Sequence, residues 1–496
     1  VLNSESGLDQ GFGTYVDTTD AAAADAPGAD VPISRRSTNE LPADVVADAA
    51  IETLRGVAGE EFFLFVHFFD PHSPYEPPAE FRQRYDRPDR DERVGNYLGE
   101  IAYVDQQVGR VLDELDALGL AEDTIVVLTA DHGEAFGENG EIGHSYFVYD
   151  TTMHVPLLLR YPPRVPAGLR VERQVRNVDI APTVLDLIGF AYVPGIQGVS
   201  LVPYLDDPTQ DLGLVAYVET LAPFLDYRYS PLRGLRDGQW KYILAPRPEL
   251  FDVAADPEEL ENLHESRPEV AERMKNALVD LVGANPPLAA AGPGEAPDAE
   301  EVARLQALGY GGGGEDVSEL ADLEPQGPDP KDRIQQMTLA STALRVFFDR
   351  NYPTAERMYA TLLQSDPDNL LFLMKHGDSL LALEQVSKAV ARFERVLQLD
   401  AVHVEARRRL GRLHAARGEL DVAAGHFREV TRAARTDASA FVEYGRILAM
   451  NQQLDLAEAA LERAHELDPD DIEAVELLSK VWIVQRRFDR AIELLE

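Results

Sequence analysis

The segment Thr124-Ile125-Val126-Val127-Leu128-Thr129-Ala130-Asp131-His132-Gly133-Glu134 joins an apolar run directly to a group of polar side chains. The run at residues 124–128 predicts a buried strand. A buried strand that ends in a carboxylate and an imidazole is a common way to present two metal ligands at the edge of a parallel sheet. A helix N-cap followed by a turn is the alternative interpretation of Asp131-His132-Gly133.

Two further apolar runs predict strands, and three segments with helical spacing predict helices. The strands are expected at residues 62–69 and 155–159, and the helices at residues 41–54, 96–118 and 179–189. Gly119 supplies a stop signal for the second helix. Strand–helix–strand alternation of this kind indicates an α/β sheet with helices on both faces.

The pattern changes after this region. Residues 214–245 form short alternating segments with turns, and helical spacing follows at residues 269–282. This combination predicts a small α+β subdomain that closes the α/β unit. Residues 286–335 are rich in Pro, Gly, Ala and acidic side chains, which is typical of a linker.

The last third of the chain repeats every 34 residues. The recurring positions are Ala355, Ala389, Ala423, Ala457 and Ala491; Gly377, Gly411, Gly445 and Ser479; and Tyr359, Phe393, Phe427, Leu461 and Leu495. Small residues at fixed places let paired helices approach closely, and large ones fill the space between pairs. The pattern resembles the tetratricopeptide repeat, an all-α solenoid, in four complete units and a partial fifth. The predicted domains are therefore residues 1–285, the linker 286–335 and the repeats at 336–496.

Composition excludes several classes of partner. The chain has 87 acidic and 46 basic residues among 496, a formal net charge of −41, which opposes binding to nucleic acid or anionic lipid. No lysine precedes Lys241, so an anion in the first half must be held by Arg, His, backbone amides or a metal ion. Cysteine is absent, which excludes disulfides and thiolate ligands. No apolar run approaches the roughly 20 residues of a membrane span.

Histidines recur in loops that follow or precede the expected strands. His72 follows the run at residues 62–69, His132 follows the run at 124–128, and His144 lies in a Gly-rich loop before the run at 155–159. Pockets in open α/β sheets form outside the carboxyl ends of the strands. The three histidines are therefore expected to share one pocket.

At this point the chain resembles a known family, the sulfatase branch of the alkaline phosphatase superfamily. The matching stretches are Asp70-Pro71-His72-Ser73-Pro74-Tyr75, Leu128-Thr129-Ala130-Asp131-His132-Gly133-Glu134, Gly143-His144 through His154-Val155-Pro156, Asp179-Ile180-Ala181-Pro182-Thr183, Gln239-Trp240-Lys241-Tyr242 and Glu249-Leu250-Phe251-Asp252. They span about residues 1–285 in the order of the family. The resemblance implies an alkaline-phosphatase-like sheet sandwiched by helices, with the small α+β subdomain after it.

The resemblance also implies roles for single residues. Asp131 and His132 would be two ligands of a catalytic divalent metal ion. Calcium is the usual ion of the family, but many sulfatases have Asn where this chain has His132, so manganese, magnesium or zinc stay open. His72 and His144 would contact the sulfate group or protonate the leaving oxygen, for which the free pKa of about 6.5 is suitable. Lys241 is a candidate substrate contact, although a structural role is the more common one for a lysine in a strand.

The nucleophile that the resemblance implies is not found in this chain. Sulfatases use a hydrated formylglycine made from the first residue of a Cys/Ser-X-Pro-Ser-Arg motif, and the nearest text, Pro32-Ile33-Ser34-Arg35-Arg36, has the wrong order. In the family this motif and an Asp-Asp metal pair precede the segment with which the chain begins. The chain is therefore expected to be a fragment without its own turnover, with the formylglycine in the missing N-terminal part.

The leading hypothesis is thus a metal-dependent hydrolase of sulfate esters on a small molecule or glycan, with a repeat array that binds a protein or peptide. A phosphoester or phosphonate hydrolase or a phosphotransferase of the same superfamily is one alternative, and a non-catalytic binding protein built on the repeats is another. The chain begins Val1-Leu2-Asn3 without a signal-peptide pattern. Localisation stays open, and a periplasmic or otherwise exported protein is compatible with the family.

Overall fold

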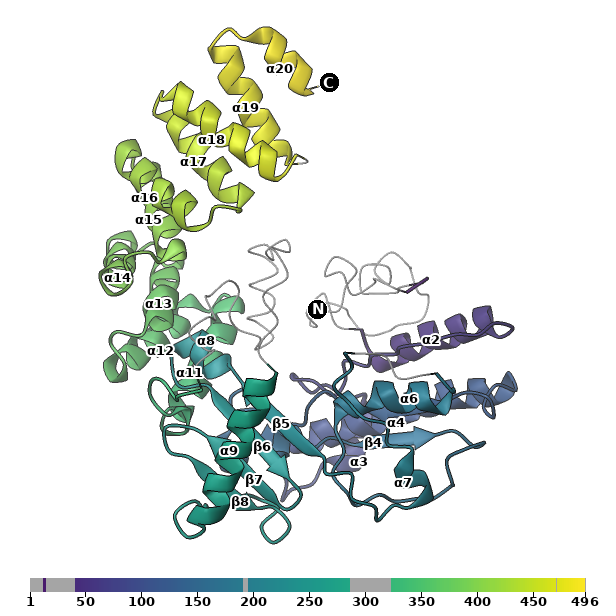
Figure 1. The fold of residues 1–496 in the computed structure, drawn as a ribbon. Coiled ribbons are helices and arrows are strands. Elements are labelled where there is room, and N and C mark those ends of the chain that lie inside the picture. Colours follow the sequence, from purple (N-terminus) through teal and green to yellow (C-terminus); the bar gives the residue numbers. More distant parts are fainter. Residues whose placement is uncertain (1–11, 15–40, 191–194, 286–322, 470, 496) are drawn as a thin grey trace.

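The computed structural model describes residues 12–14, 41–190, 195–285, 323–469 and 471–495. Figure 1 shows an α/β region, a second sheet beside it, and a curved array of helix pairs that extends away from that sheet. The Pro32–Arg36 stretch and residues 286–322 of the predicted linker lie outside the described residues.

The α/β region contains short strands and helices of very different lengths. Its elements are α2 (Ala43–Val57), α3 (Ala79–Tyr85), α4 (Glu92–Ala117), β1 (Val126–Thr129), β2 (Ala135–Phe136), β3 (Ile142–Gly143), α5 (Asp150–Met153), β4 (Leu157–Arg160), α6 (Ile180–Leu187) and α7 (Pro203–Asp206). The predicted helices at residues 41–54, 96–118 and 179–189 are confirmed as α2, α4 and α6. The predicted strands at 124–128 and 155–159 are present as β1 and β4, each shifted by one or two residues, but the predicted burial of the first is wrong, because no residue of β1 is buried and Leu128 is 37% exposed.

The prediction of a buried strand at residues 62–69 is wrong. The segment pairs with no strand of the described chain, and alternate side chains point into solvent, with Phe63 at 75% and Phe65 at 62% exposure. Phe62 and Leu64 instead pack against the cluster of Leu54, Leu115 and Ala121 between α2 and α4. The continuous apolar run at residues 62–69 therefore predicted an extended segment correctly but its burial wrongly. Burial of both faces of a strand requires a covering layer on each face, and the composition of one segment does not supply that layer.

The expectation of parallel strands is also corrected for this pair. β1 and β4 run antiparallel, with Thr129 opposite Leu157 and Val126 opposite Arg160. The reason is the connection: residues 130–156 contain the β2–β3 hairpin, a 3-10 turn at Glu138–Gly140 and the single turn of α5, so no crossover helix returns the chain to the other end. As a result, the chain leaves β1 and enters β4 at the same edge of the sheet.

The predicted α+β subdomain is present as an antiparallel meander of β5 (Val215–Thr220), β6 (Leu232–Asp237), β7 (Trp240–Leu244) and β8 (Glu249–Asp252). Helix α9 (Pro268–Ala284) covers one face of this sheet with Ala271, Met274 and Leu278, which are buried against Leu235, Tyr242 and Leu250. The short helix α8 (Ala222–Tyr227) connects β5 to β6.

The repeats form five antiparallel helix pairs. The helices are α11 (Ile334–Phe348), α12 (Tyr352–Ser365), α13 (Leu370–Ala382), α14 (Val386–Leu399), α15 (Val404–Ala416), α16 (Leu420–Ala433), α17 (Ala438–Met450), α18 (Leu454–Leu467), α19 (Ile472–Val484) and α20 (Phe488–Leu495). The small residues at 34-residue spacing lie where the helices of a pair are closest. A Cβ on Gly377 would lie 2.5 Å from the Phe393 ring, and one on Gly411 would lie 2.8 Å from the Phe427 ring.

Two further structural features repeat every 34 residues in the array. Left-handed backbone recurs at Arg350, Glu384, Gly418, Gln452 and Arg486, where the first helix of each pair ends. Side chains at Asn369, His403, Asp437 and Asp471 accept hydrogen bonds from backbone amides at the start of the next unit. Only one of these five left-handed positions is a glycine. A search of the sequence for glycine alone therefore does not find the other four turns.

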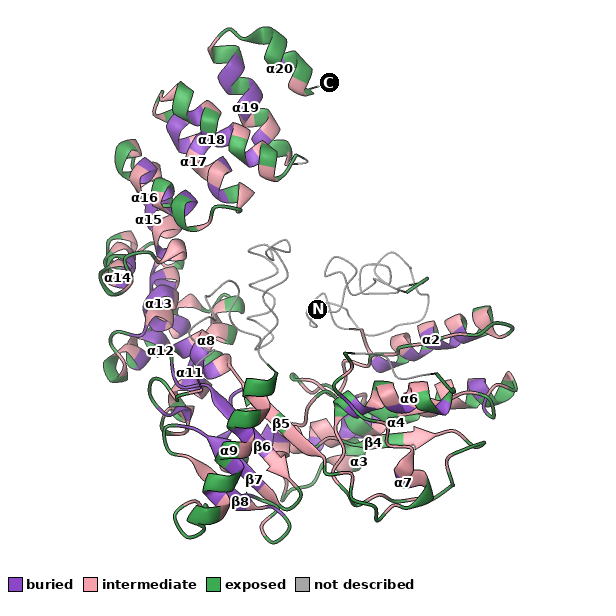
Figure 2. Ribbon diagram, in the orientation of Figure 1, coloured by how far each residue is buried: buried purple, intermediate pink, exposed green. Residues whose placement is uncertain are grey.

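The array packs directly on the sheet subdomain. A single core cluster joins Tyr146, Phe147, Val148 and Tyr149 of the α/β region to Leu232 and Ile243 of the sheet and to Met337, Ala340 and Ala343 of α11. Figure 2 shows these buried parts of the sheet and of α11 side by side. Within the described ranges, none of the helices combines the length and the apolar composition that a membrane span requires.

Candidate functional site

The site is built on the loop between β1 and β4. Because both ends of residues 130–156 lie at one edge, the whole loop folds over that edge, with β2 and β3 paired as a hairpin. Gly133 fixes the first part of the loop: its amide donates to the Thr152 carbonyl over 2.7 Å. A Cβ on Gly133 would lie 2.3 Å from the Thr151 carbonyl oxygen, so only glycine allows this approach.

The three histidines predicted to share a pocket do converge. The rings of His132 and His144 have their centroids 3.9 Å apart, and the ring of His72 lies 5.8 Å from that of His144. His72 comes from residues 70–75, which are distant in sequence from the loop that carries the other two. The tertiary structure therefore assembles one imidazole cluster from two segments.

Hydrogen bonds orient two of these rings. The Nδ1 atom of His72 lies 2.8 Å from the backbone carbonyl oxygen of Ser73. The Nδ1 atom of His132 lies at the same distance from the carbonyl oxygen of Gly133. A carbonyl oxygen only accepts, so both Nδ1 atoms carry the proton and each Nε2 atom keeps its lone pair in the neutral ring. The Nε2 atom of His72 is buried and has no hydrogen-bond partner within the described residues, which makes it available to a ligand.

Glu134 holds the third ring. Its Oε1 atom lies 3.2 Å from Nδ1 of His144, and its Oε2 atom accepts a hydrogen bond of 2.7 Å from the Tyr75 hydroxyl. Burial on its own would raise the pKa of Glu134, but the hydrogen bonds from His144 and Tyr75 lower it below the usual value. The carboxylate is therefore ionised at neutral pH. The sequence alone left Glu134 open between a solvated loop carboxylate and a group that supports the metal ligands.

Asp131 lies at the open side of the cluster. Its side chain is 72% exposed, and its Oδ2 atom is 3.7 Å from Nε2 of His132. A carboxylate oxygen and an imidazole nitrogen on adjacent residues fit two positions of a divalent metal ion. Within the described ranges, no group of three or more His, Asp or Glu side chains is arranged to hold a metal ion. The donors present thus fit part of a coordination sphere, and we derive no step through the ion.

Lys241 is not placed with the histidines. Its side chain is 1% exposed, and its Nζ atom lies 2.8 Å from Asp150 and 2.9 Å from Glu259. Arg236 also pairs with Asp150. This network ties β6 and β7 to α5, directly behind the residues that contact Gly133. The geometry favours the structural role over a substrate contact, because a substrate does not reach a lysine that is enclosed by two carboxylates.

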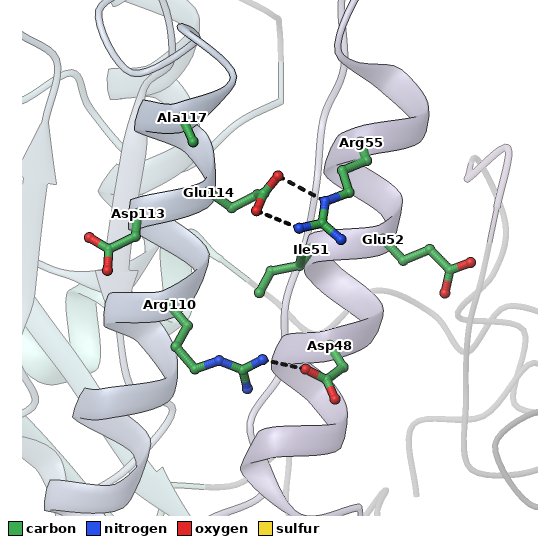
Figure 3. Close-up of a pocket in the computed structure, with 8 residues that line it drawn as sticks. All are labelled: Asp48, Ile51, Glu52, Arg55, Arg110, Asp113, Glu114 and Ala117. Atoms are coloured by element: carbon green, nitrogen blue, oxygen red, sulfur yellow. Dashed lines mark hydrogen bonds and ion pairs between the residues drawn. The ribbon is translucent and has the colours of Figure 1, made fainter. Parts of the chain in front are cut away.

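A separate surface groove of about 700 Å³ lies between α2 and α4. Figure 3 shows that two ion pairs cross it, Arg55 with Glu114 and Arg110 with Asp48. The residues that line it include none of the histidine cluster. Both arginines are already paired with carboxylates on the surface, so the groove offers no site comparable with the loop at β1.

Comparison with known proteins connects this geometry to a family. The family model described as Sulfatase matches residues 3–190, and the model described as N-sulphoglucosamine sulphohydrolase, C-terminal, matches residues 137–283. The first match contains His72, Asp131, His132 and His144. The N-terminal half of the chain belongs to the sulfatase family. The sulfatase region and its C-terminal subdomain are thus the α/β and α+β parts of the fold, and the family is one of sulfuric ester hydrolases. A third model, Tetratricopeptide repeat, matches residues 374–438 and confirms the repeat assignment.

Individual sulfatases are similar to this region at about one third identity. The choline-sulfatase of Rhizobium meliloti is 34% identical over 209 residues, which are 40% of this chain and 38% of the relative. The arylsulfatase K of Mus musculus is 32% identical over 197 residues, 38% of this chain and 35% of the relative. The chain thus spans less than two fifths of these curated relatives. Among solved structures, BT4656 in complex with D-glucosamine-2-N,6-O-disulfate is 29% identical, with 40% of this chain and 42% of that chain covered and a TM-score of 0.36.

Proposed function

We propose that the sulfatase region recognises a sulfate ester through His72 and His144, and that Asp131 and His132 hold a divalent cation beside them. The observation that supports this most is the convergence of the three imidazole rings, at 3.9 and 5.8 Å, on one edge of the sheet. A protonated imidazole donates hydrogen bonds to sulfate oxygens from both of its nitrogens, and the buried Nε2 atom of His72, which has no other partner in the described chain, would donate in that form.

In this proposal His144 and His72 contact the same sulfate group, and each ring is oriented by a different partner. Glu134 accepts a hydrogen bond from Nδ1 of His144 and so fixes the orientation of the ring that contacts the sulfate in this proposal. His72, with its Nδ1 bonded to the Ser73 carbonyl, contacts the same group through Nε2. In the protonated form either ring is able to give a proton to the leaving oxygen of an ester. A divalent cation, with calcium as the first candidate, would neutralise charge on the sulfate oxygens and activate the nucleophile. We assign the role of nucleophile to no residue of the described chain.

The repeat array adds a second part to the proposal, the binding of a protein or peptide in its superhelical groove. The support is the arrangement of five helix pairs in one curved stack, which leaves an extended concave surface. Substrate identity beyond the sulfate ester does not follow from the residues of the site.

The test is the binding of inorganic sulfate to the purified chain by isothermal titration calorimetry, with and without Ca²⁺, Mn²⁺ or Zn²⁺. We expect His72→Ala and His144→Ala each to weaken sulfate binding about fivefold or more, since each removes one hydrogen bond to an anion. His264→Ala, in the α+β subdomain, is the matched control. Asp131→Asn and His132→Ala should reduce the metal retained after desalting, as measured by elemental analysis. Equal sulfate binding by the wild type, His72→Ala, His144→Ala and His264→Ala would refute the assignment.

A further inference from the structure

The loop that carries His144 has a second face, which turns toward the repeat array. His144 points to His132 and Glu134, whereas Tyr146, two residues later, is buried on the opposite side. The Tyr146 hydroxyl lies 3.0 Å from the Tyr227 hydroxyl of α8 and 2.9 Å from the Ser341 hydroxyl of α11. A residue of the first repeat is therefore hydrogen-bonded to a residue two positions from the candidate catalytic histidine.

Little freedom remains in the backbone between these two residues. Ser145 has a backbone φ angle of +98°, in the left-handed region that residues other than glycine rarely adopt. The carbonyl oxygen of Ser145 accepts a hydrogen bond from the Thr220 hydroxyl. The amides of Tyr146 and Phe147 donate to the buried carboxylate of Glu141 over 2.8 and 3.3 Å. A conformation of this kind persists only where the surroundings fix it. A displacement of Tyr146 therefore displaces His144 as well, because the backbone between the two residues does not adjust.

The array forms much of those surroundings. Phe147, Val148 and Tyr149 share one core with Met337 and Ala343 of α11, which are fully buried. Ile334, at the start of α11, also belongs to this packing and approaches Gly140 at the beginning of the loop. Packed cores transmit displacement because they contain few voids.

Polar contacts at the edge of this core hold the array in one orientation. The Tyr229 hydroxyl donates to Asp366 over 3.1 Å, and the Asn369 side chain donates to the Tyr227 carbonyl over 3.1 Å. Lys331 donates to the Arg247 carbonyl and pairs with Glu249. These bonds connect α8 and the sheet to residues on both sides of the first repeat, so the repeat is not free to rotate about the Tyr146–Ser341 contact.

We propose that the first repeat unit, α11 with α12, positions His144 through Tyr146, which makes the tetratricopeptide array a structural component of the candidate active site. The proposal rests on the function proposed above for His144. Tyr146 and Ser341 are positioning residues: neither faces the imidazole cluster, and both act through the backbone of residues 143–146. Ser341 lies at an exposed position of α11, so its replacement changes the contact without opening the core.

The experiment compares Tyr146→Phe, Ser341→Ala and Ser341→Thr in the full chain. Ser365→Ala is the control, because the Ser365 hydroxyl bonds to the Leu362 carbonyl within its own helix. Hydrogen exchange of residues 141–149 is measured by mass spectrometry. The imidazole resonances of His144 are followed in ¹⁵N–¹H spectra, assigned with His144→Gln. We expect Tyr146→Phe and Ser341→Ala to speed exchange in residues 141–149 about fivefold and to shift the His144 resonances.

Ser341→Thr keeps the hydroxyl, so its hydrogen exchange in residues 141–149 and its His144 resonances should equal those of the wild type. Ser365→Ala should change neither measurement. Unchanged exchange in Tyr146→Phe and Ser341→Ala would overturn the proposal, and so would faster exchange with unshifted His144 resonances. Both readouts are independent of sulfate and of metal. A chain that shows the coupling but binds no sulfate would support the role of the array in the loop and overturn only the proposed function.

Discussion

Nδ1 of His144 lies 3.2 Å from the Oε1 atom of Glu134, and this pair organises the imidazole cluster. Both side chains are largely buried, and the second carboxylate oxygen is occupied by the Tyr75 hydroxyl. The carboxylate therefore fixes the ring of His144 and links it to residues 70–75, the segment that carries His72.

Replacement of Glu134 by Gln should destabilise the fold at pH 7. Gln keeps the shape but loses the charge that receives the hydrogen bonds of His144 and Tyr75, and such bonds contribute roughly 1.5–3 kcal/mol. The measurement is the free energy of unfolding in urea. Glu258→Gln, at an exposed position, is the control for the removal of one negative charge from a chain of −41. Equal unfolding free energies for the two variants would contradict the role of Glu134.

Gly133→Ala should displace the loop at β1. The added methyl would lie 2.3 Å from the Thr151 carbonyl oxygen, so the two backbones must separate and the hydrogen bond to Thr152 is lost. We expect a destabilisation of about 2 kcal/mol or more. Gly109→Ala in α4 meets no atom within 4 Å and should stabilise the chain by up to about 1 kcal/mol. Thermal unfolding compares the two, and a similar melting temperature for both would show that the close approach at Gly133 does not exist in solution.

Lys241→Met tests whether this lysine supports the fold or binds substrate. The variant leaves Asp150 and Glu259 buried without their shared cation, and removal of one partner of a buried pair costs roughly 3–5 kcal/mol. Lys275→Met, at an exposed position of α9, should change stability little. The double variant Lys241→Met with Glu259→Gln should recover part of the loss in urea unfolding. Normal stability of Lys241→Met together with weaker sulfate binding would favour the substrate role instead.

Stability should depend on pH through Glu141. Burial is the main cause that raises the pKa of this carboxyl group to about 7 from the usual 4.5. A raised folded pKa means that the stabilisation is complete below about pH 4.5 and is lost as the pH rises through 7. The loss approaches roughly 3 kcal/mol above pH 8, at 1.36 kcal/mol for each pKa unit.

Glu141→Gln is neutral at every pH and isolates this effect. The difference in unfolding free energy, variant minus wild type, should become more positive between pH 5 and pH 8. Urea unfolding at four pH values measures it. A difference that stays constant over this range would show that Glu141 titrates normally.

Much of the fold was predictable because its signals are local. The helices α2, α4 and α6 follow from apolar spacing within single segments. The repeats follow from side chains that recur every 34 residues, and the contacts of Gly377 with Phe393 and of Gly411 with Phe427 show why those positions are small. The convergence of His72, His132 and His144 was predictable for a related reason, since each follows or precedes an apolar run and so lies near an edge of the sheet.

The features that the sequence placed wrongly or left undecided depend on contacts between distant segments. Phe63 and Phe65 have the composition of a buried strand, yet no described layer covers them. For Lys241 the sequence left a structural role and a substrate contact open, and the structural role depends on Asp150 and Glu259, about 90 and 20 residues away along the chain, which enclose it. Glu134 gains its role from Tyr75, which is 59 residues distant. None of these partners is indicated by local periodicity.

The helices, the 34-residue repeat and the sulfatase motifs are legible in the amino-acid sequence, because each is encoded by the identity and spacing of neighbouring side chains. The antiparallel pairing of β1 with β4, the position of their loop at one edge of the sheet, and the contact of Tyr146 with Ser341 across 195 residues of chain are visible only in the folded molecule. Burial and hydrogen-bond pairing are properties of two surfaces in contact, and a single segment specifies only one of those surfaces.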